Sequence, residues 1–230
     1  MKIHFSGCSI TAGEGFDLGK NDTRLYPNLV GQALNAEVIN DALGGSSNLK
    51  IFTTAAKAMI DNPADVYVIQ WSAVHRFWLY PRPDRGIYLS VNKPDPAYRD
   101  FIVQFQMLNH DYPNLMAVID YSRILDTMAT SAGSKIVFVN GMLPWTEDLL
   151  KRENPSDYNK LLFKGFTDDE RAYYWHHLAN NLELVDWTKW TNPWKNMTPD
   201  MHLDNAPLDD HPGPKTHNSI AELVLEKIKC

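Results

Sequence analysis

The stretch "MKIHFSGCSITAGEGF" (residues 1–16) places a strand, a sharp turn and a serine in direct succession. Residues 2–5 alternate polar and apolar side chains, which is the pattern of a short half-buried strand. Gly7 allows a sharp turn after this strand, and Ser9 follows the turn closely. A serine in such a place serves either as a helix cap or as a nucleophile, and the remaining sequence has to distinguish the two roles.

Beyond this stretch, short apolar runs alternate with longer helix-like segments. Further strands are predicted at residues 36–40, 65–71 and 135–141. The last two are nearly continuous in valine and isoleucine, as in strands that are covered on both faces. Helices are predicted at residues 25–35, 47–61, 97–109, 113–131 and 214–229. This alternation predicts an α/β sandwich with a mostly parallel sheet.

Two aromatic-rich regions interrupt the alternation. Residues 72–96 combine proline, arginine and aromatic side chains, which predicts a long loop or a small hairpin. Residues 142–207 hold five of the seven tryptophans. Long loops in compact domains are usually functional or disordered, and this aromatic content argues against disorder. Tryptophan and tyrosine faces suit sugar rings, although burial in the core is the alternative. We therefore expect one domain, residues 1–230, with these two insertions.

Composition and charge exclude several classes of protein. The chain has 230 residues, 44% of them hydrophobic and 22% charged, which is typical of a soluble globular domain. A net charge of −6 without a dense basic run argues against a nucleic-acid partner. No apolar stretch is long enough to span a membrane, and the first residues lack the apolar core of a signal peptide. With only Cys8 and Cys230 as cysteines, a cytoplasmic location is expected.

The segment "LDDHPGP" (residues 208–214) contains the most informative pattern far from the first serine. A serine near the start and an Asp-x-His pair near the end supply a nucleophile, a base and an orienting acid for acyl transfer. The hydroxyl needs an imidazole to take its proton, and a carboxylate holds that imidazole in the correct tautomer. The glycine-rich turn in "NDALGGSSN" (residues 40–48) offers backbone N–H groups for the negative charge of the intermediate.

In this order, these segments resemble the sequence blocks of the SGNH (GDSL) hydrolase superfamily. "GCSITAG" at residues 7–13 resembles the first block, G-D-S-I-T-x-G; "NDALGGS" at residues 40–46 resembles the second, and "DDHP" at residues 209–212 resembles the last. The resemblance implies a flavodoxin-like three-layer α/β/α sandwich. It also implies that Ser9 is the nucleophile, His211 the base and Asp209 the orienting acid, with Asp210 as the alternative acid.

Two departures from the family pattern concern the first and third blocks. Cys8 replaces the usual aspartate beside the nucleophile, and "IQWSAVHR" (residues 69–76) replaces the third block, G-x-N-D. The resemblance then implies an oxyanion hole made by the Ser9 and Gly45 amides, with the Ser72 hydroxyl in place of the missing asparagine. Candidate substrate-binding residues are Asn48, Trp71, His75 and Arg76.

Other interpretations remain open for several polar residues. Cys8 is either a second nucleophile or a packed thiol. His217 either packs near the start of the last helix or joins Asp209 and His211 in a metal site. The sequence lacks H-E-x-x-H and Cys/His ligand spacings, so no metal is expected. No Walker A or dinucleotide-binding glycine pattern is present either, so no organic cofactor is expected.

Together these observations predict a serine esterase that hydrolyses a small acyl ester, such as an acetyl ester, through an acyl-enzyme. A carbohydrate or another polar alcohol is the expected second half of the substrate. An acyltransferase would differ only in the acceptor. A non-catalytic carbohydrate-binding module on the same fold is the rival hypothesis, and the missing third block favours it. A metal-dependent phosphoesterase is a third alternative.

Overall fold

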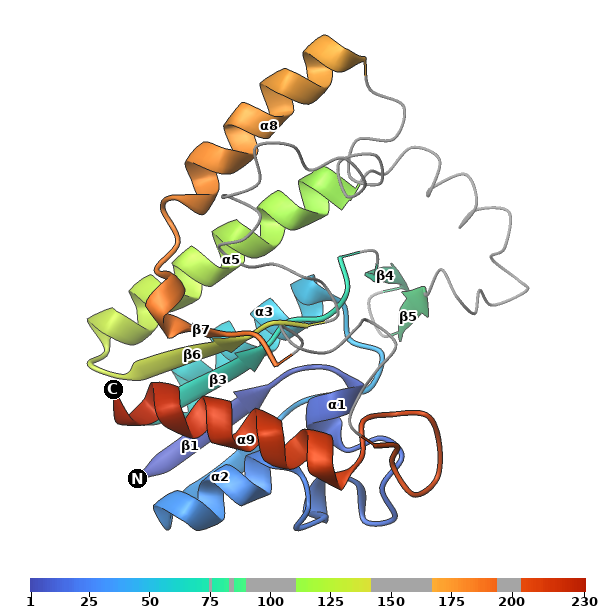
Figure 1. Ribbon diagram of the computed structural model, residues 1–230, viewed down its shortest axis with the longest axis vertical. Coiled ribbons are helices and arrows are strands. Elements are labelled where there is room, and N and C mark those ends of the chain that lie inside the picture. The colour runs from blue at the N-terminus through green and yellow to red at the C-terminus, as the bar shows by residue number, and fades with distance from the viewer. Residues whose placement is uncertain (75, 83–84, 90–110, 142–166, 194–203) are drawn as a thin grey trace.

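The computed structural model describes residues 1–74, 76–82, 85–89, 111–141, 167–193 and 204–230 (Figure 1). Its centre is a five-stranded sheet in which every pairing is parallel. In spatial order the strands are β2 (Glu37–Asn40), β1 (Lys2–Ser6), β3 (Val66–Gln70), β6 (Lys135–Val139) and β7 (Trp190–Thr191). Counted along the chain, this is the 2-1-3-4-5 order of flavodoxin-like folds. The predicted α/β class and parallel sheet are therefore confirmed.

Helices cover both faces of the sheet, which gives three layers (Figure 1). One face packs against α3 (Asn48–Asp61) and α5 (Asp111–Ser131), and the other against α2 (Tyr26–Leu34) and α9 (Pro214–Lys229). Strand β3 serves both layers because its side chains alternate. Tyr67 and Ile69 join the α3 and α5 side, whereas Val66 and Val68 join the other. The nearly continuous apolar sequence of β3 follows from this double burial.

Local signals explain where the helices begin. Ser47 caps α3 by accepting a hydrogen bond from the Lys50 backbone nitrogen. Helix α9 has Pro214 in its first turn, where the missing N–H costs nothing. The predicted helices at residues 25–35, 47–61, 113–131 and 214–229 are all present with nearly the expected ends. The helix predicted at residues 97–109 lies outside the described residues.

The described parts of the aromatic-rich regions contain regular structure. In the first, β4 (Phe77–Arg82) and β5 (Arg85–Leu89) form an antiparallel hairpin. Of the two structures predicted there, a long loop or a small hairpin, the described residues form the hairpin. The second contains helix α8 (Asp168–Leu182), the 3₁₀ helix η3 (Trp187–Lys189) and strand β7, none of which was predicted. Helix α8 does carry a sequence signal, because Thr167 and Glu170 form a capping box.

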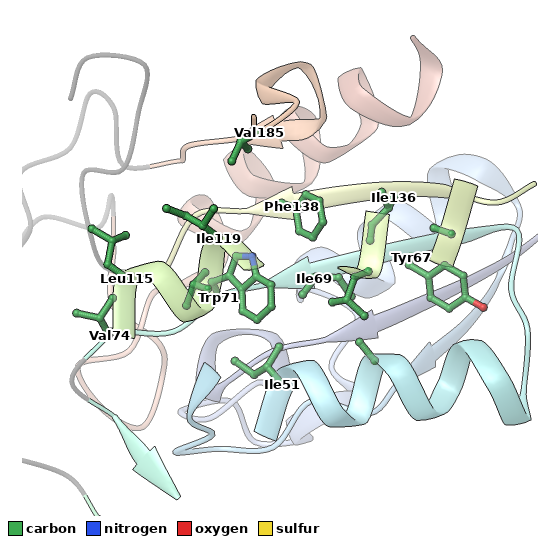
Figure 2. Packing of buried hydrophobic residues seen from close by; sticks show 14 of the residues in the cluster. Ile51, Tyr67, Ile69, Trp71, Val74, Leu115, Ile119, Ile136, Phe138 and Val185 are labelled. Atoms are coloured by element: carbon green, nitrogen blue, oxygen red, sulfur yellow. The ribbon is translucent and has the colours of Figure 1, made fainter. Parts of the chain in front are cut away.

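Aromatic side chains fill the layer between the sheet and the α3–α5 side. Figure 2 shows Trp71 and Phe138 side by side above Ile51 of α3. The rings of Trp71 and Phe138 stack with centroids 6.2 Å apart, and Phe138 also contacts Trp190 of β7. At least part of the tryptophan content therefore belongs to the core. Within the described ranges, no helix has the length and apolar character needed to cross a bilayer.

Candidate active site

The candidate nucleophile lies just beyond the carboxyl end of β1. Ser9 begins the short helix α1 (Ser9–Ala12), and only 2% of its surface is exposed. A Cβ atom on Gly7 would lie 2.3 Å from Thr11 Oγ1, so the turn before Ser9 has room only for glycine. The cap position of α1 belongs to Cys8, whose side chain makes no capping hydrogen bond. The Ser9 hydroxyl is therefore not used as a helix cap.

Gln70, at the end of β3, holds this turn in place. Its Oε1 atom accepts hydrogen bonds from the Cys8 backbone nitrogen at 3.2 Å, from Cys8 Sγ at 3.2 Å and from Thr11 Oγ1 at 3.0 Å. Its Nε2 atom donates to the Trp71 carbonyl at 2.6 Å. Gln70 is 2% exposed, so these bonds are shielded from water. The sequence signal for this role was a polar residue that ends an otherwise apolar strand.

Cys8 has the environment of a packed thiol. It is 1% exposed and belongs to the apolar cluster on the α3–α5 side. Its Sγ atom donates to Gln70 and lies 4.0 Å from Ser9 Oγ. In this position the thiol helps to fix the turn that carries Ser9.

The candidate base and acid interact as the Asp-x-His spacing predicts. His211 Nδ1 lies 2.9 Å from Asp209 Oδ2, and the His211 backbone nitrogen donates to Asp209 Oδ1 at 2.9 Å. Partial burial raises the pKa of Asp209, but the bonds from the His211 backbone and ring outweigh it and hold that pKa below its ordinary value. The ring therefore faces an ionised carboxylate, and its contact is with Asp209 rather than Asp210.

A glycine brings this loop against the turn that follows Ser9. The Leu208 backbone nitrogen donates to the Gly15 carbonyl at 3.0 Å. Gly15 has a positive φ of 85°, and a Cβ atom there would lie 2.3 Å from Asp209 Oδ1. The Asp209 carboxylate thus occupies space that only glycine leaves free. Two segments from opposite ends of the chain meet at this contact.

The base of this loop rests on a buried histidine. His217 is 1% exposed, and its Nδ1 atom accepts a hydrogen bond from the Tyr26 backbone nitrogen at 3.2 Å. Burial lowers its pKa to about 4. Asp204 caps the start of α9 by accepting hydrogen bonds from the backbone nitrogens of Lys215 and Thr216. Within the described ranges, no group of three or more histidine, cysteine or acidic residues is arranged to hold a metal ion.

Besides Ser9, the predicted oxyanion-hole residues Gly45 and Ser72 lie on the loops after β2 and β3. The turn with Gly45, at a φ of 70°, is tied to the nucleophile turn by a bond from the Leu43 nitrogen to the Gly7 carbonyl. Ser72 is 4% exposed, and its Oγ atom is buried without a hydrogen-bond partner among the described residues. Asn48 uses both ends of its amide on the Ser72 backbone, at 2.7 and 3.1 Å, and so fixes that segment.

The candidate substrate-binding residues fall in different places. Trp71 is a correction to the sequence analysis: it is 2% exposed and stacks on Phe138 in the core, so it offers no face to a ligand. Arg76 is half-buried, and in the described part of the chain its Nη1 atom has no hydrogen-bond partner. His75 lies outside the described residues.

The sequence analysis missed Glu14, whose carboxylate lies beside the ring of His211. Glu14 Oε2 is 3.5 Å from His211 Nε2, the nitrogen opposite the one that contacts Asp209. The Glu14 backbone nitrogen donates to the Ser9 carbonyl at 3.0 Å, which places it one helical turn after the serine. In the described part of the chain, no hydrogen bond joins Ser9 Oγ to His211. Catalytic hydrogen bonds are often long before substrate binds.

Comparisons with known proteins bear on this arrangement. No family model matches the chain, and no curated protein matches it. Among solved structures, an acetylxylan esterase from Geobacillus stearothermophilus is similar with a TM-score of 0.54 and 15% identity, over 100% of this chain and 94% of that one. A lipolytic protein of the G-D-S-L family from Desulfitobacterium hafniense DCB-2 is similar with a TM-score of 0.52 and 12% identity, over 98% of each chain.

A third similar structure is an acetyl xylan esterase from the rumen bacterium Butyrivibrio proteoclasticus. It has a TM-score of 0.51 and 15% identity, and the match covers 99% of this chain and 63% of that one. This chain thus spans less than two thirds of the length of the Butyrivibrio enzyme. Parallel strands in 2-1-3-4-5 order, helices on both faces and these similar structures lead to one conclusion: the chain has the α/β fold of the SGNH (GDSL) hydrolases.

Proposed function

We propose that the protein is a serine ester hydrolase with Ser9 as the nucleophile, His211 as the base and Asp209 as the orienting acid. The observation that carries this proposal is the Asp209–His211 hydrogen bond of 2.9 Å on a loop that docks against the turn after Ser9. This arrangement lies beyond the carboxyl ends of β1 and β3. In the 2-1-3-4-5 strand order, that position is the switch point where ligands bind.

The reaction follows from the chemistry of these groups. Ser9 Oγ attacks the ester carbonyl while His211 Nε2 takes its proton, and Asp209 stabilises the resulting imidazolium. The Ser9 and Gly45 amides and the Ser72 hydroxyl stabilise the negative charge on the carbonyl oxygen. The unpartnered Ser72 Oγ supports its inclusion in this group. The intermediate collapses to an acyl-enzyme as His211 protonates the leaving alcohol, and water then releases the acid by the same route.

The proposed substrate is a small acyl ester, such as an acetyl ester, of a carbohydrate. Support comes from the fold shared with two acetylxylan esterases. Arg76, half-buried on the loop after β3, has an Nη1 atom without a partner in the described ranges, and we assign its guanidinium to substrate binding. An acyltransferase would use the same acyl-enzyme with another alcohol in place of water.

Labelling with a fluorophosphonate probe tests the nucleophile directly. The wild-type protein should be labelled and should hydrolyse p-nitrophenyl acetate. Ser9→Ala should abolish both, and His211→Ala should slow labelling strongly. Ser131→Ala, which changes an exposed serine at the end of α5, is the matched control and should behave as wild type. If the wild-type protein is neither labelled nor active, the carbohydrate-binding module becomes the better hypothesis, and binding to glycans would test it.

A further inference from the structure

Glu14 is the side chain at the candidate site for which the proposed mechanism has no role. Its side chain is 48% exposed, and its Oε2 atom lies 3.5 Å from His211 Nε2. Asp209 already contacts the other ring nitrogen, Nδ1, so the imidazole lies between two carboxylates. An exposed acid in direct contact with the candidate base borders the space that a substrate must enter.

The position of this carboxylate depends on a second residue, Gly44. A Cβ atom on Gly44 would lie 1.4 Å from Glu14 Oε1, so any other residue at position 44 would displace the carboxylate. The φ angle of Gly44 is not in the left-handed region, which belongs to Gly45 in this turn. Glycine at position 44 therefore leaves the space that the Glu14 carboxylate occupies.

The contact with His211 leaves the Glu14 carboxylate free to accept a hydrogen bond. In a neutral imidazole, the Nδ1–H group donates to Asp209, and Nε2 carries a lone pair. An ionised carboxylate only accepts, so it forms no hydrogen bond with that lone pair. A donor group on a bound ligand would therefore find the Glu14 oxygens available.

The mechanism determines which half of the substrate reaches Glu14. His211 Nε2 returns its proton to the leaving alcohol, so the alcohol oxygen has to come within about 3 Å of this nitrogen. Glu14 Oε2 adjoins the same nitrogen and therefore borders the alcohol half rather than the acyl half. A hydroxyl group on the carbon adjacent to the one that bears the ester oxygen would lie within reach of it.

We propose that Glu14 is a specificity-determining residue that accepts a hydrogen bond from a hydroxyl group of the leaving alcohol, next to the ester. This inference rests on the proposed esterase function and narrows it to esters of polyhydroxy alcohols. Simple alkyl esters lack this hydrogen bond, and alcohols that carry an anionic group at this place are repelled by the carboxylate. A site built around a substrate hydroxyl discriminates strongly against analogues without it.

Two acetate esters test the inference: glycerol monoacetate, which carries neighbouring hydroxyl groups, and ethyl acetate, which carries none. Glu14→Ala, which removes the acceptor, should lower the ratio of kcat/KM for glycerol monoacetate to that for ethyl acetate by about 10- to 100-fold. Asp17→Asn is the control, because Asp17 is an exposed acid nearby in sequence that pairs with Arg24. That variant should keep the wild-type ratio of the two rates.

A second variant tests the link with Gly44. Gly44→Ala should lower the preference for glycerol monoacetate, and this loss should disappear in the Glu14→Ala background, since the two residues act through one contact. An equal loss on both esters, or no loss on either, would overturn the inference. These outcomes differ from a failure of the esterase proposal, in which the wild-type protein would hydrolyse neither ester and would resist the fluorophosphonate.

Discussion

The backbone nitrogen of Tyr26 donates a hydrogen bond to Nδ1 of His217, 191 residues away in the sequence, at 3.2 Å. The two rings also stack with centroids 5.9 Å apart, and Phe16 contacts the histidine edge-on. Through this contact the first turn of α2 supports the start of α9, directly after the loop that carries His211. The contact needs a neutral imidazole, because a protonated Nδ1 is a donor and loses its acceptor role.

The stability of the protein should therefore fall in mild acid. Burial lowers the pKa of His217 from 6.5 to about 4, and the charges of Asp204 and Asp22 offset only part of this effect. The unfolded chain takes up a proton at higher pH than the folded one. Stability that is present above pH 6.5 is lost as the pH falls towards about 4, by about 3 kcal/mol in total.

Urea unfolding between about pH 7.5 and about pH 4.5 measures this loss. In His217→Gln the pH dependence in this range should become shallower, although the variant itself is less stable. His176→Gln alters an exposed histidine of α8 and should keep the wild-type slope. An unchanged slope in the His217 variant would assign the pH dependence to other groups.

The three hydrogen bonds that Gln70 accepts should matter for both stability and nucleophile reactivity. Gln70→Met keeps the approximate size but leaves the buried Cys8 N–H without its acceptor, whereas the Thr11 hydroxyl keeps its hydrogen bond with the Tyr26 hydroxyl. We expect a loss of about 1–3 kcal/mol in the free energy of unfolding. Fluorophosphonate labelling of Ser9 should also slow, because the turn is no longer held in one geometry.

Gln32→Met provides a matched control, since Gln32 is exposed on α2. It should leave both the unfolding free energy and the labelling rate near their wild-type values. If Gln70→Met loses stability but labels at the wild-type rate, Gln70 has only a structural role.

The identity of the orienting acid can be tested with two neighbouring carboxylates. Asp209→Asn should lower kcat by about 10³- to 10⁴-fold, because the amide no longer selects the tautomer that leaves Nε2 free to act as the base. Asp210→Asn should have little effect, since the ring contact is with Asp209. Steady-state hydrolysis of p-nitrophenyl acetate measures both, and the opposite order of effects would reassign the acid to Asp210.

Alanine substitutions at two glycines with similar φ angles distinguish the cost of backbone strain from damage to the candidate site. Gly15 and Gly133 have φ angles of 85° and 71°, so alanine should cost about 1–2 kcal/mol of backbone strain at either position. Only at Gly15 would the new Cβ atom meet Asp209, whereas Gly133 has open space. Gly15→Ala should therefore lose most esterase activity, and Gly133→Ala should lose almost none. Gly133→Ala should also lose less stability than Gly15→Ala. Thermal unfolding and kcat/KM distinguish the two, and equal activities would contradict the docking role of Gly15.

The sequence predicted the elements whose signals are local. Strands β3 and β6 are continuous apolar runs, and α3, α5 and α9 are long segments with clear ends, so pattern alone places them. Strand β7 is only Trp190–Thr191, and its existence depends on pairing with Phe138 and Val139 of a distant strand. No local pattern contains that information.

The same limit applies to the candidate site. Asp209 and His211 could be paired from sequence because they are two positions apart. The roles of Gln70 and Glu14 depend on distances across the fold, to the Cys8 turn and to His211, which no spacing records. The sequence position of Trp71, directly after β3, suggested a side chain in the candidate site. In the fold its indole packs against Phe138, which the sequence position does not reveal.

Helix α9 has a consequence for the biosynthesis of the protein. Ile220, Ala221 and Val224 of this helix seal one face of a sheet whose strands are all made earlier by the ribosome. Until α9 emerges, Ile3, Phe5 and Val68 have only part of their cover on that side, from α2, so the nascent chain exposes apolar surface that is prone to aggregate. His211 emerges just before the helix, so burial of that surface and arrival of the base coincide. A ribosome-bound chain should therefore stay inert towards esters until α9 has emerged.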